Sequence, residues 1–188
     1  MDIHTTPISG LLLIEPRRFS DDRGFFVETY HRERYEKAGI ETLLPQDNHS
    51  RSTRGVLRGL HFQVKRPQAQ IVTVIRGRIF DVAVDLRPSS PTFRRWFGAE
   101  LSDEGICQIA MAPGFAHGFC ELSDVADLHY QVGSLYDPHD EGGLIWNDPS
   151  IGIKWPTIPT SISPRDAAYP AFAELLPEQL PRIASESP

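Results

Sequence analysis

The sequence predicts a mainly β fold, a sandwich or a barrel with a few short helices. Apolar runs of strand length recur at intervals of roughly 8 to 12 residues in the middle of the chain, as in sandwiches and barrels. The 188 residues include 14 Gly and 16 Pro, which interrupt the chain too often for long helices. Because strands and long helical patterns do not alternate, a doubly wound α/β fold is not expected.

The first part of the chain predicts short strands and one helix. The apolar run at 11–14 ends before Pro16 and predicts a strand. A turn at 19–24 leads to a second strand at 25–30. A helix is expected at 31–38, because Gly39 follows as a stop signal. Residues 46–50 are expected to be extended and polar.

The middle of the chain predicts strands at 71–75 and 79–86, joined by a short turn at 76–78 as a β-hairpin. In the second strand, alternate side chains place Asp81, Ala83 and Asp85 on one face. A face with two carboxylates either meets solvent or lines a polar cavity. Further strands are expected at 95–101, 105–112, 118–122 and 127–132.

The composition changes after residue 156, where six prolines follow: Pro159, Pro164, Pro170, Pro177, Pro181 and Pro188. We expect a single domain over residues 1–188, with an N-terminal strand segment and a proline-rich C-terminal wrapping tail at about 157–188, both of which suit the wrapping of a neighbouring copy. One or two helical turns are expected at 172–176.

Charge and cysteine content exclude several classes of protein. The net charge of −6 implies no general attraction to nucleic acid or to an anionic membrane. The apolar runs fall far short of the ~20 residues that span a bilayer. The N-terminus has no basic region before an apolar one, so no secretory signal is expected. Two cysteines, Cys107 and Cys120, indicate a reduced, cytoplasmic protein in which both are small core residues.

Two histidines lie in glycine-rich, apolar surroundings. His61 follows Arg58 by three residues beside a glycine, and His117 lies between glycines and phenylalanines. A histidine in such a place is a base, a metal ligand or a hydrogen-bonded structural residue. One alone favours the structural interpretation, and two together shift the balance toward a site.

The sequence raises two kinds of ligand site, a metal site and a phosphate site. Metal sites usually need three or four ligands, but His61 has no His-x-His partner and His117 has only Glu121 close in sequence, so a metal is not expected. Arg23, Arg58 and Arg165 are candidates for phosphate binding, since guanidinium groups match phosphate oxygens, although ordinary surface ion pairs explain any one of them. Tyr130 and Tyr136 either pack at strand ends or serve as an acid or a stacking platform.

Ten segments of the chain together resemble the dTDP-4-dehydrorhamnose 3,5-epimerase family, the cupin-type dTDP-sugar epimerases. They run in the family's order from about residue 10 to residue 170 and are specific as a set. The segments are Phe19 with 22–26, 46–50, 55–63, 77–86, 90–93, 113–119, 136–138, 146–149, 152–156 and 163–166.

The resemblance implies a double-stranded β-helix (cupin or jelly-roll) barrel in a homodimer. It implies inversion of C3 and C5 of a dTDP-4-keto-6-deoxy-hexose, from dTDP-4-dehydro-6-deoxyglucose to dTDP-4-dehydrorhamnose, with no cofactor and no metal. His61 falls on the family's base, Tyr130 on its acid and Asp166 on the carboxylate that pairs with the base. Substrate-binding positions are Phe19, Arg23, Glu28, Gln46, Asn48, Arg58, Gln70, His117, Tyr136 (stacked on the thymine ring), Glu141 and Arg165.

One departure from the family pattern concerns the ketone. The family usually has lysine where this chain has Gln70, and the loop from His61 to that position is one residue shorter. The resemblance places that lysine near the ketone oxygen of the substrate. Gln70 would donate an uncharged hydrogen bond to this oxygen. Alternatively, Lys65 extends to the ketone and supplies the positive charge. This leaves open a single-centre epimerase (C3 or C5 only), a metal-dependent cupin or a sugar-nucleotide-binding barrel without catalysis. The intact His61, Tyr130 and Asp166 argue against the last.

Overall fold

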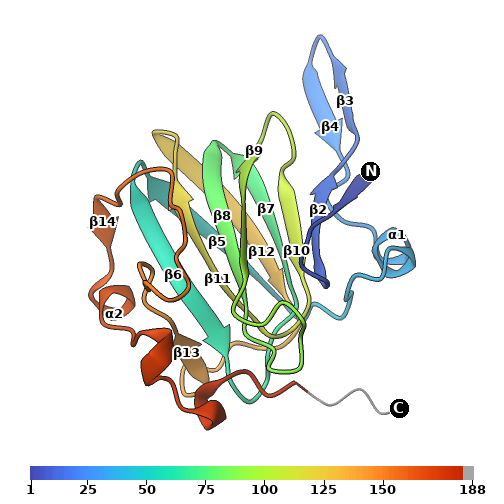
Figure 1. Cartoon of the computed structure of the whole chain (residues 1–188). Helices are drawn as coiled ribbons and strands as arrows, with labels where there is room; N and C mark the ends of the chain where they lie inside the picture. The colour runs from blue at the N-terminus through green and yellow to red at the C-terminus, as the bar shows by residue number, and fades with distance from the viewer. Residues whose placement is uncertain (184–188) are drawn as a thin grey trace.

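Two β-sheets face each other in the computed structural model, which describes residues 1–183 (Figure 1). The first sheet has six strands, in the spatial order β1 (Asp2–Thr5), β2 (Leu11–Glu15), β10 (Gln108–Met111), β7 (Gln70–Arg76), β12 (Val125–Val132) and β5 (Gln46–Thr53). The second sheet runs β13 (Glu141–Gly143), β6 (Val56–Gln63), β11 (Phe115–Glu121), β8 (Arg78–Asp85) and β9 (Trp96–Ser102), with β14 (Ser161–Ile162) parallel to β6.

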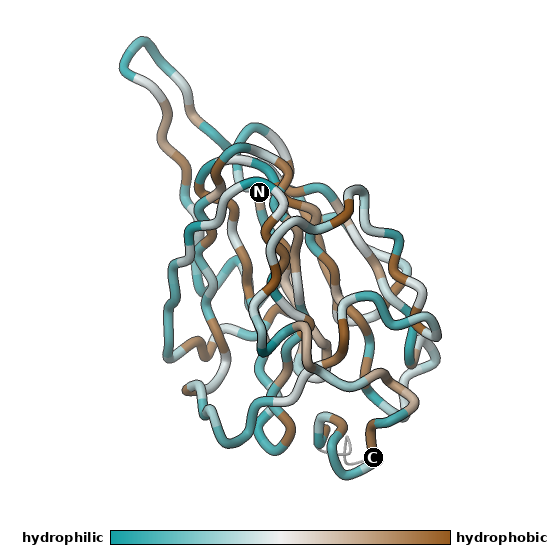
Figure 2. Tube along the Cα trace, turned by 90° about the vertical axis from the view of Figure 1, so that its left-hand side faces the viewer, coloured by the Kyte–Doolittle hydropathy of each residue, from teal (hydrophilic) through white to brown (hydrophobic). Residues whose placement is uncertain are grey.

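The remaining elements are short. A separate hairpin of β3 (Arg18–Asp21) and β4 (Gly24–Val27) projects from the body, as Figures 1 and 2 both show. The helices are α1 (Arg32–Lys37), α2 (Pro164–Ala167), η1 (Phe172–Glu174) and η2 (Pro177–Gln179). This mainly β, two-sheet barrel with a few short helices confirms the predicted fold class.

The predicted hairpin between 71–75 and 79–86 is wrong. Strand β7 pairs with β10 and β12 in the first sheet, whereas β8 pairs with β11 and β9 in the second. Gly77, at a φ of 85°, turns the chain from one sheet into the other. A short turn between two apolar strands looks the same in sequence whether the strands pair or only follow each other, because pairing depends on distant strands.

The core lies between the two sheets. Residues from both sheets meet in one cluster of buried side chains, among them Val72, Val74, Ile109 and Leu128 from the first sheet and Ile79, Ala83, Leu101 and Phe119 from the second. In Figure 2 apolar segments recur along the strands of the body and also on the projecting hairpin. A second cluster, on the outer face of the second sheet, includes Leu60, Val82 and Val84 and is covered by Trp155, Phe172 and Leu175.

Strand β8 therefore buries both of its faces. Val82 and Val84 point into the outer cluster, while Ala83 points into the core between the sheets. Asp81 and Asp85, on the same face as Ala83, are fully buried, so the interpretation of this face as solvent-exposed is wrong. Asp85 is held by Arg87, Ser90 and Thr92, and Asp81 is held at the site described below.

The C-terminal segment up to residue 183 lies against the second sheet through β14, which pairs with β6, and through the contacts of Phe172 and Leu175. The expected helical turns at 172–176 are realised as η1. The last five residues of the predicted tail lie outside the described residues. Within residues 1–183, no helix is long and apolar enough to cross a membrane.

Candidate active site

A pocket of about 270 Å³ is lined by side chains from both sheets. The second sheet contributes residues of β6, β11 and β13, and the first sheet contributes residues of β5, β7 and β12. The predicted site residues that line it are Asn48, Arg58, His61, Gln70, His117, Tyr130, Tyr136, Glu141 and Arg165.

His61 and Asp166 form a hydrogen-bonded pair at this pocket. The His61 Nε2 atom lies 3.0 Å from Asp166 Oδ1, and the backbone N–H of Gly59 donates to Asp166 Oδ2 at 3.0 Å. Burial by itself raises the pKa of Asp166, but the hydrogen bonds from His61 and Gly59 outweigh it and hold this pKa well below its usual range. Because an ionised carboxylate only accepts, Nε2 of His61 carries the proton and Nδ1 is left to accept one.

Two glycines explain why Arg58 and His61 reach the same pocket although they are three residues apart. A regular strand places residues two apart on one face, but the pairing of β6 with β11 shifts between His117 and Phe119. A Cβ on Gly59 would lie 2.5 Å from the Cα of Gly118, so the two backbones touch where the register shifts. The irregularity turns both polar side chains toward the pocket.

His117 has its own buried carboxylate. Its Nε2 atom lies 2.8 Å from Asp81 Oδ2, and Asp81 is fully buried on β8. Asp81 Oδ1 is buried without a hydrogen-bond partner among the described residues. Because a buried carboxylate is stabilised by a charged or hydrogen-bonding partner, the His117 ring is held in a fixed orientation toward the pocket.

Tyr130 approaches the pocket from the opposite sheet. It lies on β12, and its hydroxyl donates a hydrogen bond to Ser50 Oγ on β5. Burial raises the pKa of Tyr130, so the hydroxyl keeps its proton at neutral pH. The pocket therefore has an imidazole on one wall and a protonated phenol on the other.

Glu141 gathers three donors at the rim of the pocket. Its Oε2 accepts from the Tyr136 hydroxyl at 2.7 Å, and its Oε1 accepts from the Tyr169 hydroxyl at 2.6 Å. Arg165 Nη1 lies 2.7 Å from the same Oε1. The hydrogen bond to the carboxylate raises the pKa of Tyr136, and this residue is 45% exposed, which leaves it accessible for stacking.

Gln46 forms hydrogen bonds to two residues that line the pocket, Asn48 and Tyr136. Its amide Nε2 donates to Asn48 Oδ1 at 2.9 Å, and its Oε1 accepts from the backbone N–H of Tyr136 at 2.9 Å. Gln70, at the start of β7, lines the pocket itself, whereas Lys65 lines a separate hollow beside Val64 and His139.

Three predicted substrate-binding residues lie away from this pocket. Phe19 and Arg23 are on the projecting hairpin, where Arg23 pairs with Asp21 at 2.5 Å and is 90% exposed. Glu28 follows the hairpin and pairs with Arg34 at 2.5 Å. Within one chain, these residues and the pocket do not form a single site.

Asp81 and Tyr169 hold side chains of the pocket in place, but the sequence did not assign them to the site. The pocket is also lined by residues that were not assigned: Phe62, Gln63, Gln68, Gly118, Phe119 and Val132. Asp81 was visible only as a carboxylate on one face of a strand, because its partner His117 lies 36 positions away and in another strand. Tyr169 lies in the proline-rich tail, and no sequence motif or pattern marks it as a site residue. Each acquires its place through pairing of distant segments.

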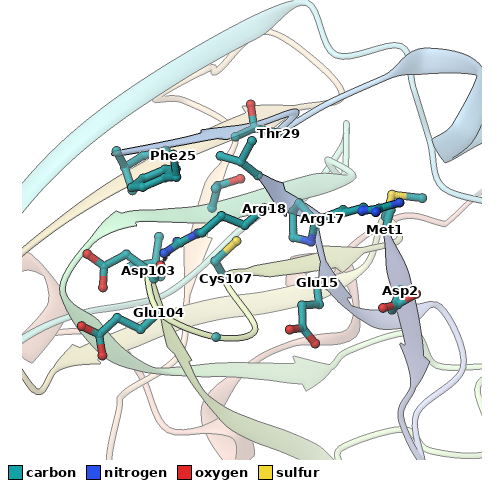
Figure 3. Close-up of a pocket in the computed structure, with 16 residues that line it drawn as sticks. Met1, Asp2, Glu15, Arg17, Arg18, Phe25, Thr29, Asp103, Glu104 and Cys107 are labelled. Carbon is teal, nitrogen blue, oxygen red and sulfur yellow. Dashed lines mark hydrogen bonds between the residues drawn. The ribbon is translucent and has the colours of Figure 1, made fainter. Parts of the chain in front are cut away.

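A larger hollow, of about 660 Å³, lies at the base of the hairpin (Figure 3). Arg18 crosses it, with its guanidinium 4.2 Å from the Phe25 ring centre and a hydrogen bond to the backbone oxygen of Asp103. The hollow is lined by side chains of both charges, among them Asp2, Glu15 and Arg17. None of the residues that line it was predicted for the site. Across residues 1–183, no group of three or more His, Cys, Asp or Glu is arranged to hold a metal ion.

Comparison with known proteins identifies the family. The sequence model described as dTDP-4-dehydrorhamnose 3,5-epimerase matches residues 5–174. A protein of that name from Methanothermobacter thermautotrophicus is 49% identical over 151 residues, which are 80% of this chain and 82% of that protein. A dTDP-4-dehydrorhamnose 3-epimerase from Streptomyces niveus is 43% identical over 176 residues, 93% of this chain and 85% of that protein.

Comparison with solved structures identifies the same family. The crystal structure of a dTDP-6-deoxy-D-glucose-3,5-epimerase from Legionella pneumophila, in complex with dTDP-4-keto-L-rhamnose, superposes with a TM-score of 0.93. It is 44% identical in sequence, and the match covers 98% of this chain and 99% of that one. This chain belongs to the dTDP-4-dehydrorhamnose 3,5-epimerase family.

Proposed function

We propose that this protein inverts C3 and C5 of a dTDP-4-keto-6-deoxy-hexose, converting dTDP-4-dehydro-6-deoxyglucose to dTDP-4-dehydrorhamnose. The observation that carries the proposal is the placement of His61 and Tyr130 on opposite sheets of the barrel, facing one pocket. Inversion of a carbon needs a base on one face of the sugar and an acid on the other. The relatives of this chain with that name support the same assignment.

The chemistry follows from the ketone. A 4-keto group acidifies the hydrogens on both neighbouring carbons, so His61 Nδ1 removes one of them and leaves an enolate. The Tyr130 hydroxyl then donates its proton to the same carbon from the opposite face, and both residues return to their starting states by exchange with solvent. Asp166 stabilises the imidazolium that forms on His61.

Binding energy remote from the reacting carbons positions the sugar. Arg58 and Arg165 offer guanidinium groups at the pocket for the diphosphate, and the exposed ring of Tyr136 offers a face for the thymine base. The enolate oxygen requires a donor, and Gln70 supplies a neutral amide on the pocket wall. Activity therefore needs no cofactor and no metal in this proposal.

A second candidate is epimerisation at one centre only. The observation that favours it is Gln70, because a neutral amide stabilises an enolate less than the ammonium group usual in the family. A relative at 43% identity carries the name of a 3-epimerase. In this alternative the slower centre fails to exchange.

We further propose that the protein acts as a homodimer in which the hairpin of one copy reaches the pocket of the other. Phe19, Phe25 and Phe26 on the hairpin are 52%, 58% and 68% exposed, which is unusual for three aromatic rings on ten residues of chain unless another surface covers them. The hairpin also carries Arg23, a predicted substrate ligand, away from the pocket of its own chain. A second copy would bring these residues to the substrate.

We also propose that the protein is located in the cytoplasm. Cys107 and Cys120 are both buried free thiols, and they are the only cysteines of the chain, which suits the reducing cytoplasm.

The test of the activity is incubation with dTDP-4-keto-6-deoxyglucose in deuterated water, with NMR detection of exchange at C3 and C5. Exchange at both positions supports the 3,5-epimerase, exchange at one supports the second candidate, and exchange at neither overturns both. A parallel sample treated with EDTA should keep its rate. Loss of activity there, restored by one metal, would establish a metal-dependent enzyme instead.

The test of the dimer uses two variants, His61→Ala and Arg23→Ala, each of which we expect to have little activity alone. In a mixed dimer of His61→Ala and Arg23→Ala chains, one pocket has an intact His61 and receives an intact Arg23 from the other copy. Activity should reappear when the two variants are mixed and allowed to exchange subunits. If Arg23 acts within its own chain, every pocket in the mixture lacks one residue and the mixture stays inactive. Light scattering on the parent should report two copies.

A further inference from the structure

Gly143 is the cross-strand neighbour of His61. The two residues are paired in the antiparallel ladder between β13 and β6. A Cβ added to Gly143 would lie 2.3 Å from three ring atoms of Tyr169, so the missing side chain leaves a space that the Tyr169 ring fills. The glycine thus admits an aromatic ring from the C-terminal segment to the immediate surroundings of the base.

The Tyr169 ring contacts the His61 ring. Their centres are 5.6 Å apart and their planes are inclined by 67°, an edge-to-face arrangement that aromatic rings favour. Asp166, three residues before Tyr169 in the chain, holds the Nε2 atom of the same imidazole. His61 is therefore restrained by the Asp166 carboxylate and by the packed Tyr169 ring, both supplied by a single short segment.

The Tyr169 hydroxyl connects this base to the rim of the pocket. It donates to Glu141 Oε1 at 2.6 Å, the oxygen that Arg165 also contacts, while Tyr136 holds Glu141 Oε2. Burial, and next the hydrogen bond to the carboxylate, raise the pKa of Tyr169, so its hydroxyl stays protonated as a donor. One side chain thus touches the proposed base and the proposed nucleotide end.

We propose that Tyr169 is a positioning residue with two separate effects: its ring sets the orientation of the base His61, and its hydroxyl sets Glu141 and through it Arg165 and Tyr136. The inference rests on the proposed epimerase function, since it assigns the residue a role in that reaction. Tyr169 itself does not take or give a proton.

The two effects predict different kinetics. Tyr169→Phe keeps the ring and removes the hydroxyl, so KM for the dTDP-sugar should rise while kcat stays close to that of the parent. Tyr169→Ala also removes the ring, so kcat should fall by roughly 10- to 100-fold, because small misplacements of a catalytic group reduce rates by such factors. Exchange of the substrate hydrogen into deuterated water should fall in the same proportion as kcat.

Gly143→Ala provides the matched test, because it displaces the Tyr169 ring, and the hydroxyl that the ring carries, while every polar group of the chain is retained. Gly143 does not have a positive φ, so the added methyl introduces no backbone strain. Alone, the change should lower kcat as Tyr169→Ala does. In a Tyr169→Ala background it should have little further effect, since the ring that it displaces is already gone.

The control is Tyr30→Phe, which removes a hydroxyl that bonds to Thr42 far from the pocket and should leave kcat and KM unchanged. The His61 ring signals in a ¹H–¹³C NMR spectrum of the free protein provide a second measurement. They should shift in Tyr169→Ala and in Gly143→Ala but not in the control, because the aromatic ring beside them is lost or moved.

Three results would overturn the inference: parental kcat in both Tyr169→Ala and Gly143→Ala, an undiminished effect of Gly143→Ala in the Tyr169→Ala background, or unshifted His61 signals. The failure of the proposed function looks different. In that case the parent itself shows no exchange, while the NMR shifts still report whether Tyr169 packs on His61.

Discussion

His61 and His117 are directly opposite each other in the antiparallel pair of β6 and β11. Each ring is bonded to a buried carboxylate, His61 to Asp166 at 3.0 Å and His117 to Asp81 at 2.8 Å. The two pairs differ in access to solvent, since the His61 side chain is 30% exposed and that of His117 is 10% exposed. This difference suits His61 for proton exchange with a substrate and His117 for a fixed hydrogen bond or charge.

Replacement of His61 by alanine should abolish most turnover and leave binding of dTDP nearly intact. Loss of a general base lowers rates by roughly 10²- to 10⁴-fold, while Arg58, Arg165 and Tyr136 remain at the nucleotide end. Steady-state kinetics and calorimetric titration with dTDP measure the two quantities. Turnover equal to that of the parent would show that another group is the base.

Asp81→Asn should weaken the hydrogen bond that orients the His117 ring and should leave the His61–Asp166 pair unchanged. The substitution removes the charge that faces His117 Nε2, and hydrogen bonds to charged groups contribute about 1.5 to 3 kcal/mol, so kcat/KM should fall by roughly 10- to 100-fold. A thermal melt shows whether the folded state is retained. An unchanged kcat/KM in a folded variant would leave the Asp81–His117 pair as structural support only.

Gln70→Lys should raise the rate of exchange at the slower of the two carbons, C3 or C5. An ammonium group forms charge-assisted hydrogen bonds that are roughly twice as strong as those of a neutral amide, so the enolate should form more readily. NMR in deuterated water follows both positions separately. Rapid exchange at both carbons in the parent, unaltered by the substitution, would show that Gln70 is a spectator or that Arg58 or His117 compensates for it.

Glu121→Gln should stabilise the fold, and more so at pH 8 than at pH 4. Glu121 is fully buried, its Oε2 lacks a partner among the described residues, and burial raises its pKa. The folded state therefore binds this proton more tightly than the unfolded state, so stability is highest below the unfolded pKa and declines as the pH rises through the raised folded value. A neutral amide removes that decline.

The expected gain for Glu121→Gln is roughly 2 to 4 °C in Tm at pH 8, the shift that about 1 kcal/mol produces in a chain of this size. At pH 4 the two melting temperatures should approach each other. Calorimetry at both pH values measures the difference. A variant that melts lower than the parent at pH 8 would show that the buried amide is worse accommodated than the carboxyl.

Much of the fold could be predicted because strand alternation and turn glycines are local. The strands near 11–14, 46–50, 71–75 and 127–132 and the helix near 31–38 all lie where the pattern placed them. Gly39 follows α1 at a φ of 74°, a conformation that ends a helix and that glycine adopts without strain. The site residues that the family resemblance implies could likewise be named from the sequence, and most of them line one pocket.

The sequence by itself determined the strand content and the mainly β class, because these depend on neighbours within a few positions. Its motifs also supplied the residue types needed for proton transfer. The tertiary structure alone decided that β7 and β8 lie in different sheets, that Asp81 pairs with His117 and that Tyr169 fills the space beside Gly143. It also decided that Arg23 lies outside the pocket of its own chain. The physical reason is that each of these contacts joins segments distant in sequence, whose meeting depends on the pairing of the whole sheet and on no local preference.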